Sequence, residues 1–239
     1  MKIALILFLG LALFAGPLSA QDDGGVDPEA AKAAVADLKK AFKGKDPDEQ
    51  LAAVRKYADL LDKSVIKEIG AGLNARDQAV KLGTLEVLGS MRHEDALKEL
   101  HRFAGKKTTQ KDSLLFAATL KAIGRHADPS SIKVLAKNPW SNIDAQVVRA
   151  RVYGLGNIRQ KDSVDELMKM MNKGRPLPGE DSAFMGDFQV ALCRLTGTDQ
   201  TTNKSMWQNW WSSNKKDFEV AEVPQPMPRI LQVQWDDFW

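Results

Sequence analysis

Residues 122–135 read AIGRHADPSSIKVL, and two relatives of this stretch occur elsewhere in the chain: VLGSMRHEDALKEL at 87–100 and GLGNIRQKDSVDEL at 154–167. All three have glycine third, an apolar residue eight positions later and leucine last. In chain order these are Gly89, Leu97 and Leu100, then Gly124, Ile132 and Leu135, then Gly156, Val164 and Leu167. A less regular copy has Ala58 at the glycine position, followed by Ile66 and Ile69. Positions 58, 89, 124 and 156 are 31, 35 and 32 residues apart. A period in the thirties made of two helices predicts an α-solenoid.

Each unit can be understood as a helical hairpin. Its first helix carries apolar residues on one face, such as Leu115 and Ile123, and its glycine lets the next helix approach closely. A short polar turn then supplies a capping residue, and Pro129 fits the first turn of the second helix. Because one hairpin cannot cover its own apolar face, neighbouring hairpins are expected to stack.

Helix signals continue outside these copies. Asp27 and Asp46 each precede a proline and acidic residues, which is typical of a helix start, and Gly44 is a helix stop. No sustained alternation of β-branched residues predicts a sheet. We therefore expect an all-α protein, a right-handed α-solenoid of about five helical hairpins. Residues 21–45 are expected to form an N-terminal helix and lead-in, 46–215 the repeats, and 216–239 an extended C-terminal tail.

The pattern resembles HEAT-type repeats, including the short variety named after phycobilisome lyases, over about residues 46–213. The Leu-Thr-Gly turn at 195–197, followed by Trp207, Trp210 and Trp211, is similar to the closing hairpin of exported bacterial HEAT-repeat proteins. The three tryptophans fall on one helix face and are expected to seal the end of the core, with a ligand-stacking platform as the alternative.

The first twenty residues have the features of a secretory signal peptide: Lys2, an apolar run from Ile3 to Ala15, Pro17 and a small-residue end at Ser19-Ala20. Export is therefore expected, to a periplasm or out of the cell, with no membrane-spanning segment after residue 20. Without this segment the chain has 33 basic and 31 acidic residues, a balance that argues against a nucleic-acid partner. The single cysteine, Cys193, cannot form an internal disulfide and is expected to be a small buried side chain.

The opening stretch holds the ingredients of a hydrolytic site in His126, Asp128, Ser130 and Ser131. Neighbours in a turn do not make a triad, however, and these residues are better explained as a capping turn. The His93-Glu94 pair resembles one element of the di-iron site in deoxyhypusine hydroxylases, but three histidines are too few for such a site. We therefore expect no catalytic residue, no metal and no cofactor.

The remaining residues of interest are candidates for binding a partner. Three prolines, Pro224, Pro226 and Pro228, predict that the tail is extended, and its aromatic residues predict that it folds back on the solenoid rather than docking elsewhere. The candidate partner-binding residues are Arg149, Arg151, Arg159, Trp235, Phe238 and Trp239. The expected function is an exported, non-catalytic scaffold that binds another protein through a solenoid face or the tail. The alternatives are an enzyme-like chromophore lyase, which the family resemblance allows, and a structural component of the cell envelope.

Overall fold

The protein is described by a computed structural model covering residues 26–142, 144–173 and 183–239. These residues form α-helices and short 3₁₀-helices and contain no strand, which confirms the all-α class. The signal-peptide prediction for residues 1–20 lies outside the described part. The α-helices are α1 (Pro28–Lys43), α2 (Pro47–Lys56), α3 (Lys63–Ile69), α4 (Gln78–Ser90), α5 (Glu94–Ala104), α6 (Lys107–Lys111), α7 (Ser113–Arg125), α8 (Ile132–Ala136), α9 (Ala145–Asn157), α10 (Lys161–Lys173), α11 (Met185–Thr196), α12 (Lys204–Asn214) and α13 (Arg229–Phe238). The 3₁₀-helices are η1 (Gly70–Asn74) and η2 (Pro129–Ser131).

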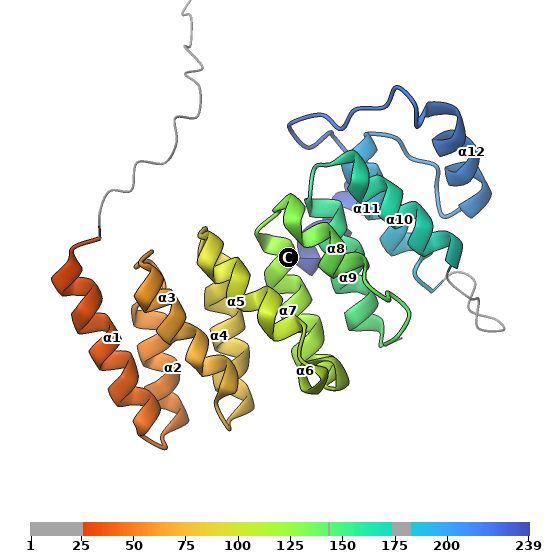
Figure 1. The fold of residues 1–239 in the computed structure, drawn as a ribbon. Coiled ribbons are helices and arrows are strands. Elements are labelled where there is room, and N and C mark those ends of the chain that lie inside the picture. The colour runs from red at the N-terminus through yellow and green to blue at the C-terminus, as the bar shows by residue number, and fades with distance from the viewer. Residues whose placement is uncertain (1–25, 143, 174–182) are drawn as a thin grey trace, which may run out of the picture.

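The helices lie in two layers (Figure 1). In one layer α2 contacts α4, α4 contacts α7, α7 contacts α9, and α9 contacts α11. In the other, α1 contacts α3, α3 contacts α5, α8 contacts α10, and α10 contacts α12. Most of the buried apolar side chains form one cluster that extends from α1 to α12 between the layers. Among the described residues, none of the helices combines the length and the hydropathy needed to cross a bilayer.

The repeated glycines lie where helices of the first layer cross. A Cβ atom on Gly89 would lie 3.0 Å from the Ala122 backbone of α7, and one on Gly156 would lie 2.8 Å from the Ala191 side chain of α11. At Gly124 the Cβ position is only 2.7 Å from the Cα atom of Gly154 in α9. The predicted close approach is confirmed, and its partner is the first helix of the following hairpin. The repeated leucines Leu100, Leu135 and Leu167 are fully buried.

Helix starts follow the capping signals of the sequence. The carboxylates of Asp27 and Asp46 accept hydrogen bonds from the backbone amides of Glu29 and Asp48, at 3.0 and 2.9 Å. The second helices of the hairpins show the same rule, because Asp62 caps α3, His93 caps α5 and Asp128 caps η2. These three caps are each four residues after their unit's Ala or Gly, so His93 takes the place of an aspartate.

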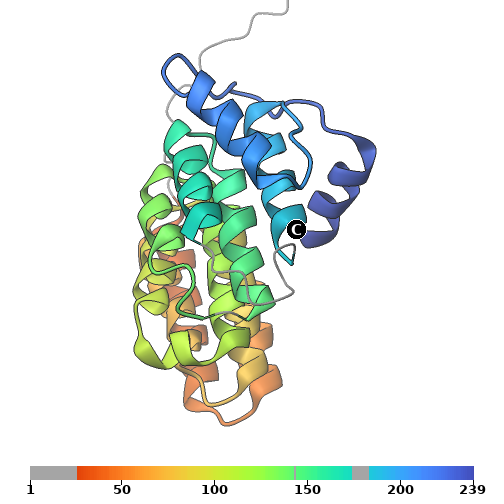
Figure 2. The same cartoon turned by 90° about the vertical axis from the view of Figure 1, so that its right-hand side faces the viewer.

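The C-terminal segment differs from the extended tail predicted by its prolines. Residues 215–228 have no regular secondary structure, but Arg229–Phe238 forms α13, and Pro228 is its N-cap residue. Since no proline follows Pro228, a helix can start there, and Leu231 and Trp235 fall on one face of it. Figure 2 shows α13, in the darkest blue, turned back beside α11, which it contacts. The predicted folding back is therefore confirmed, whereas the predicted extended conformation is wrong.

Candidate partner-binding surface

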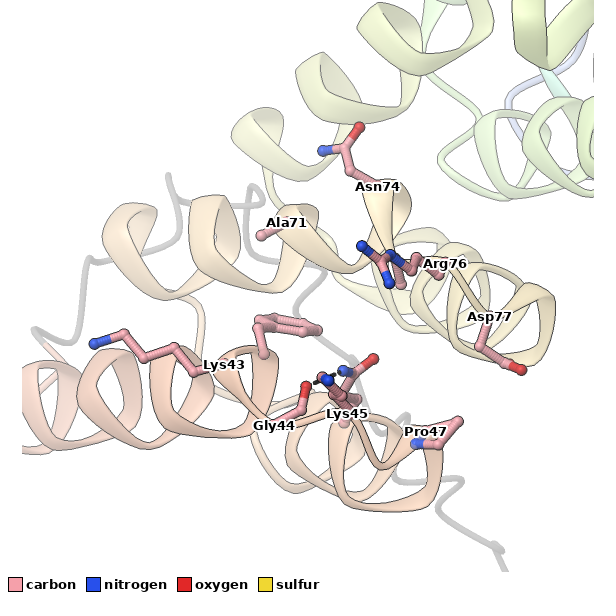
Figure 3. A pocket seen from close by; sticks show the side chains of 11 residues that line it. Lys43, Gly44, Lys45, Pro47, Ala71, Asn74, Arg76 and Asp77 are labelled. Carbon is pink, nitrogen blue, oxygen red and sulfur yellow. Dashed lines mark hydrogen bonds between the residues drawn. The ribbon is translucent and has the colours of Figure 1, made fainter.

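An open cavity in the described part of the chain, here called cleft 1, measures about 680 Å³. The α1–α2 connection forms one side of it and the connection from η1 to α4 forms the other (Figure 3). It is lined by Phe42, Lys43, Gly44, Lys45, Pro47, Gln50, Ala71, Asn74, Ala75, Arg76 and Asp77. The lining thus contains three cationic side chains, one carboxylate and a partly buried phenylalanine ring.

Local signals hold the walls of cleft 1 in place. Gly44 ends α1, and its amide donates to the carbonyls of Lys40 and Ala41. The Gln50 side chain donates to the Gly44 carbonyl at 3.0 Å and so ties the loop to α2. The Asp77 carboxylate accepts from the amides of the first turn of α4, at 2.7 and 3.2 Å. The one carboxylate in the lining therefore serves as the cap of α4, whereas Lys45 and Arg76 remain exposed.

A second opening of about 270 Å³, here called cleft 2, lies one hairpin further along the same edge. Cleft 2 is lined by Leu73, Asn74, Lys81, Phe103, Lys106, Thr108, Thr109, Asp112 and Leu115, so the two clefts share Asn74. The Lys106 ammonium donates to the Asn74 side-chain oxygen at 2.7 Å and lies 5.2 Å from the centre of the Phe103 ring. The carboxylate of Asp112 caps α7 by accepting from Leu115.

Neither cleft can be recognised in the sequence, because each is assembled from loops about thirty residues apart. One local sequence pattern does occur along the edge of the protein that carries the two clefts. A basic residue precedes the capping aspartate of three successive first helices, in the pairs Lys45-Asp46, Arg76-Asp77 and Lys111-Asp112. In each pair the aspartate is used as a helix cap.

The predicted arginine candidates all interact within the chain, and one of them is buried. Arg151 is buried, so its assignment to a partner surface is wrong. Its guanidinium donates to the carbonyl of Leu135 near the end of α8 and lies 5.2 Å from the Phe116 ring centre, and burial lowers its pKa to about 10. Arg149 pairs with Asp187 of α11 at 3.3 Å.

Arg159 bonds to two carbonyls, those of Arg194 in α11 and Ala221 in the segment before α13, at 3.1 and 2.6 Å. These bonds hold the non-helical connection to α13 against the hairpins. The Arg159 side chain therefore has a structural role within the chain.

The predicted aromatic candidates of the tail are packed within the chain. Trp235 is buried beside Cys193, and its ring stacks on Tyr153 of α9 with centroids 5.6 Å apart. Phe238 stacks on the same tyrosine at 4.3 Å, and Trp239 is partly buried against Gly124. α13 also has cations at its end, because Lys121 donates to the Phe238 carbonyl and Arg125 to that of Trp239. These side chains are not free to bind another protein while α13 is docked.

Cys193 and the closing tryptophans are found as predicted. Cys193 is buried, and burial raises its pKa to about 11. Trp207 and Trp211 are buried and Trp210 is partly buried, all three packed against the main core. The indole nitrogens of Trp207 and Trp211 donate to the Thr201 carbonyl and the Asp165 carboxylate. The tryptophans therefore close the core, as the sequence predicts.

His126 and Ser131 of the opening stretch join their hairpin to the preceding one, which holds His101 and Leu88. Nε2 of His126 lies 2.9 Å from the Leu88 carbonyl, and Nε2 of His101 lies 2.9 Å from the hydroxyl of Ser131. Ser131 is fully buried, so its hydroxyl cannot reach a substrate in this structure. Asp128 caps the turn through the Ser130 amide, which confirms the capping interpretation for Asp128. Within the described residues no group of three or more potential metal ligands comes together.

Neither a protein-family model nor a curated protein sequence matches this chain. The function therefore has to be argued from the geometry.

Because His101 and His126 join neighbouring hairpins, we expect the protein to lose stability in mild acid. Burial is the main cause that lowers the pKa of His101 and of His126 below 6.5. The unfolded chain then takes up these protons before the folded protein does, so their contribution is complete above pH 6.5 and falls as the pH drops through the lowered pKa values. Asp62 and Asp128 also have lowered pKa values, but their contribution changes only in stronger acid, below about 3.8.

We expect the urea midpoint to be lower at pH 5.5 than at pH 7.5. The double variant His101→Gln/His126→Gln is expected to lose much of this difference, since glutamine does not titrate. An equal pH dependence in the two proteins would assign the effect to other groups.

Proposed function

We propose that the chain is an exported, non-catalytic scaffold, built as a right-handed α-solenoid of HEAT-like repeats, that binds another protein at the edge carrying cleft 1. Two features support the solenoid. The first helices contact one another in chain order, and the repeated glycines fall at equivalent crossings between them. Export is supported by the character of residues 1–20 in the sequence.

The observation that carries the binding proposal is that cleft 1 has two cationic side chains that make no ion pair within the described part of the protein. Lys45 and Arg76 are exposed on opposite sides of the cleft, and neither makes an ion pair with another described residue. The other candidate cations and the aromatic residues of α13 are bound within the chain. Solenoids present partner-binding surfaces that extend over several repeats, and a cleft between adjacent hairpins is such a surface.

We expect the variant Lys45→Glu/Arg76→Glu to lose its partner while keeping its fold. Purified wild-type chain and the variant would be immobilised separately and exposed to envelope extract of the source cells. The expected result is one or a few proteins held by the wild type and lost from the variant, with an unchanged helical circular-dichroism spectrum. Reversing two exposed charges on one cleft should weaken binding by about tenfold or more, because attraction becomes repulsion.

The matched control is Lys133→Glu/Lys216→Glu, which reverses two exposed lysines outside both clefts. This control should hold the same proteins as the wild type. If the cleft variant and the control retain them equally, cleft 1 is not the binding site.

A further inference from the structure

We infer that the partner presents an extended, acidic segment that lies across cleft 1 and cleft 2 together. This inference rests on the proposed function and adds the chemistry of the ligand. It is carried by the continuity of the two clefts, by the balance of charge along them and by their apolar floors.

The two clefts form one continuous track. They share Asn74, whose side-chain oxygen accepts a hydrogen bond from the Lys106 ammonium of cleft 2 at 2.7 Å, so the two clefts meet at this residue. Neighbouring packed helices are about 8–10 Å apart, and an extended chain advances about 3.3 Å per residue. About three residues of an extended segment therefore cover the step from one cleft to the next. A helix, which advances only about 1.5 Å per residue, would need about six.

The charge along this track favours an acidic ligand. Five cations line it and only two carboxylates do: Lys43, Lys45, Arg76, Lys81 and Lys106 against Asp77 and Asp112. Both carboxylates accept hydrogen bonds from the amides at a helix start, where the helix dipole favours negative charge. Three further acids lie close by. Asp46 and Asp48 flank Pro47 of the lining, and Asp46 is the N-cap of α2, whereas Glu49 has a carboxylate oxygen 3.7 Å from the Cβ position of Gly44. The cations are therefore the groups left for a ligand to neutralise.

The apolar residues beneath each cleft indicate which apolar side chain of the acidic ligand segment fits there. Cleft 1 has the partly buried ring of Phe42 and the exposed Ala71, and its larger volume accepts a large apolar side chain. Cleft 2 has well-buried Leu73, Phe103 and Leu115 beneath it and less than half that volume, so we assign the smaller of two apolar side chains to it. The segment is thus acidic, with a large and a small apolar residue three positions apart.

The probe is a fluorescein-labelled peptide of ten residues, all glutamate except for phenylalanine at its fourth position and valine at its seventh. Fluorescence anisotropy with the purified chain should show saturable binding that weakens as salt is raised, since exposed charges are screened. Lys45→Glu/Arg76→Glu should lower the affinity about tenfold, and Lys106→Glu several-fold. Glu49→Gln should raise it, because one repulsive charge is removed. Lys133→Glu/Lys216→Glu should leave it unchanged.

Three results would overturn the inference: no saturable binding up to millimolar peptide, equal binding of a peptide with lysine in place of glutamate, or equal affinities in wild type and Lys106→Glu. Tighter binding of a thymidine decamer than of the peptide would instead indicate a nucleic-acid ligand, and would also overturn it. If the envelope partner still depends on Lys45 and Arg76 while the peptide fails to bind, the inference is wrong and the proposed function stands.

Discussion

Replacing Gly124 by leucine is expected to lower the free energy of unfolding by about 3 kcal/mol or more, at the upper end of the range for overpacked cores. The Cβ atom alone would lie 2.7 Å from the Cα atom of Gly154 and 2.9 Å from the edge of the Trp239 ring. Trp239 can turn away, but the Gly154 backbone cannot move without separating α7 from α9. The measurement is urea denaturation followed by circular dichroism.

The control for this substitution is Gly186→Leu in α11. A Cβ atom on Gly186 would have no atom within 4 Å, and leucine has a higher helix propensity than glycine by up to about 1 kcal/mol. The control is therefore expected to be neutral or slightly stabilising. A Gly124→Leu protein as stable as the Gly186→Leu protein would show that α7 and α9 do not cross closely at Gly124.

The glycine crossings could be predicted because their cause repeats in the sequence. A small residue at the same place in successive units is a local pattern, and a close approach of two backbones is the reason for it. Gly89, Gly124 and Gly156 all lie at such crossings. The hydrophobic spacing of the second helices is equally local, and Leu100, Leu135 and Leu167 are fully buried as expected.

Arg151 shows where local pattern fails. Arginine is charged and usually exposed, so its residue type indicates a surface position. In the structure two carbonyls near the end of α8, those of Val134 and Leu135, accept its hydrogen bonds. Only the packing of α9 against α8 brings those carbonyls within reach, and nothing in the sequence near Arg151 reports it.

The clefts and the helical conformation of the tail were not predicted, for two different reasons. Each cleft is formed by loops from successive hairpins, so no continuous stretch contains its lining. Pro224, Pro226 and Pro228 predict an extended chain, but all three precede residue 229. Proline excludes a helix around itself but is well suited to its start, and Leu231 and Trp235, four residues apart, already indicate an apolar helix face.

Replacing Trp235 by alanine is expected to undock α13 and expose Cys193 to a thiol reagent. Trp235, Leu231, Tyr153, Val190 and Cys193 form a buried cluster that is separate from the main core. Truncating a buried tryptophan costs about 3–5 kcal/mol. Because α13 is joined to the hairpins through a connection with no regular secondary structure, this cost should appear as local opening rather than unfolding of the whole chain.

A cost of about 3 kcal/mol corresponds to roughly a hundredfold larger open fraction, and the rate at which Cys193 reacts should rise by about the same factor. Burial suppresses this thiol in the closed state, both by covering it and by raising its pKa to about 11. As it is the only cysteine in the chain, the absorbance released by a disulfide reagent reports this site alone.

The matched control is Ile230→Ala, which lies on the same helix but is 69% exposed. This variant should react at the wild-type rate, because its side chain contributes little to docking. A Trp235→Ala protein that reacts as slowly as the wild type would show that the remaining contacts hold α13 without the indole. Those contacts include the burial of Leu231, the stacking of Phe238 on Tyr153, and the bonds from Lys121 and Arg125 to the last carbonyls. If they do not suffice, as we expect, the indole of Trp235 is the anchor that keeps α13 on α9 and α11.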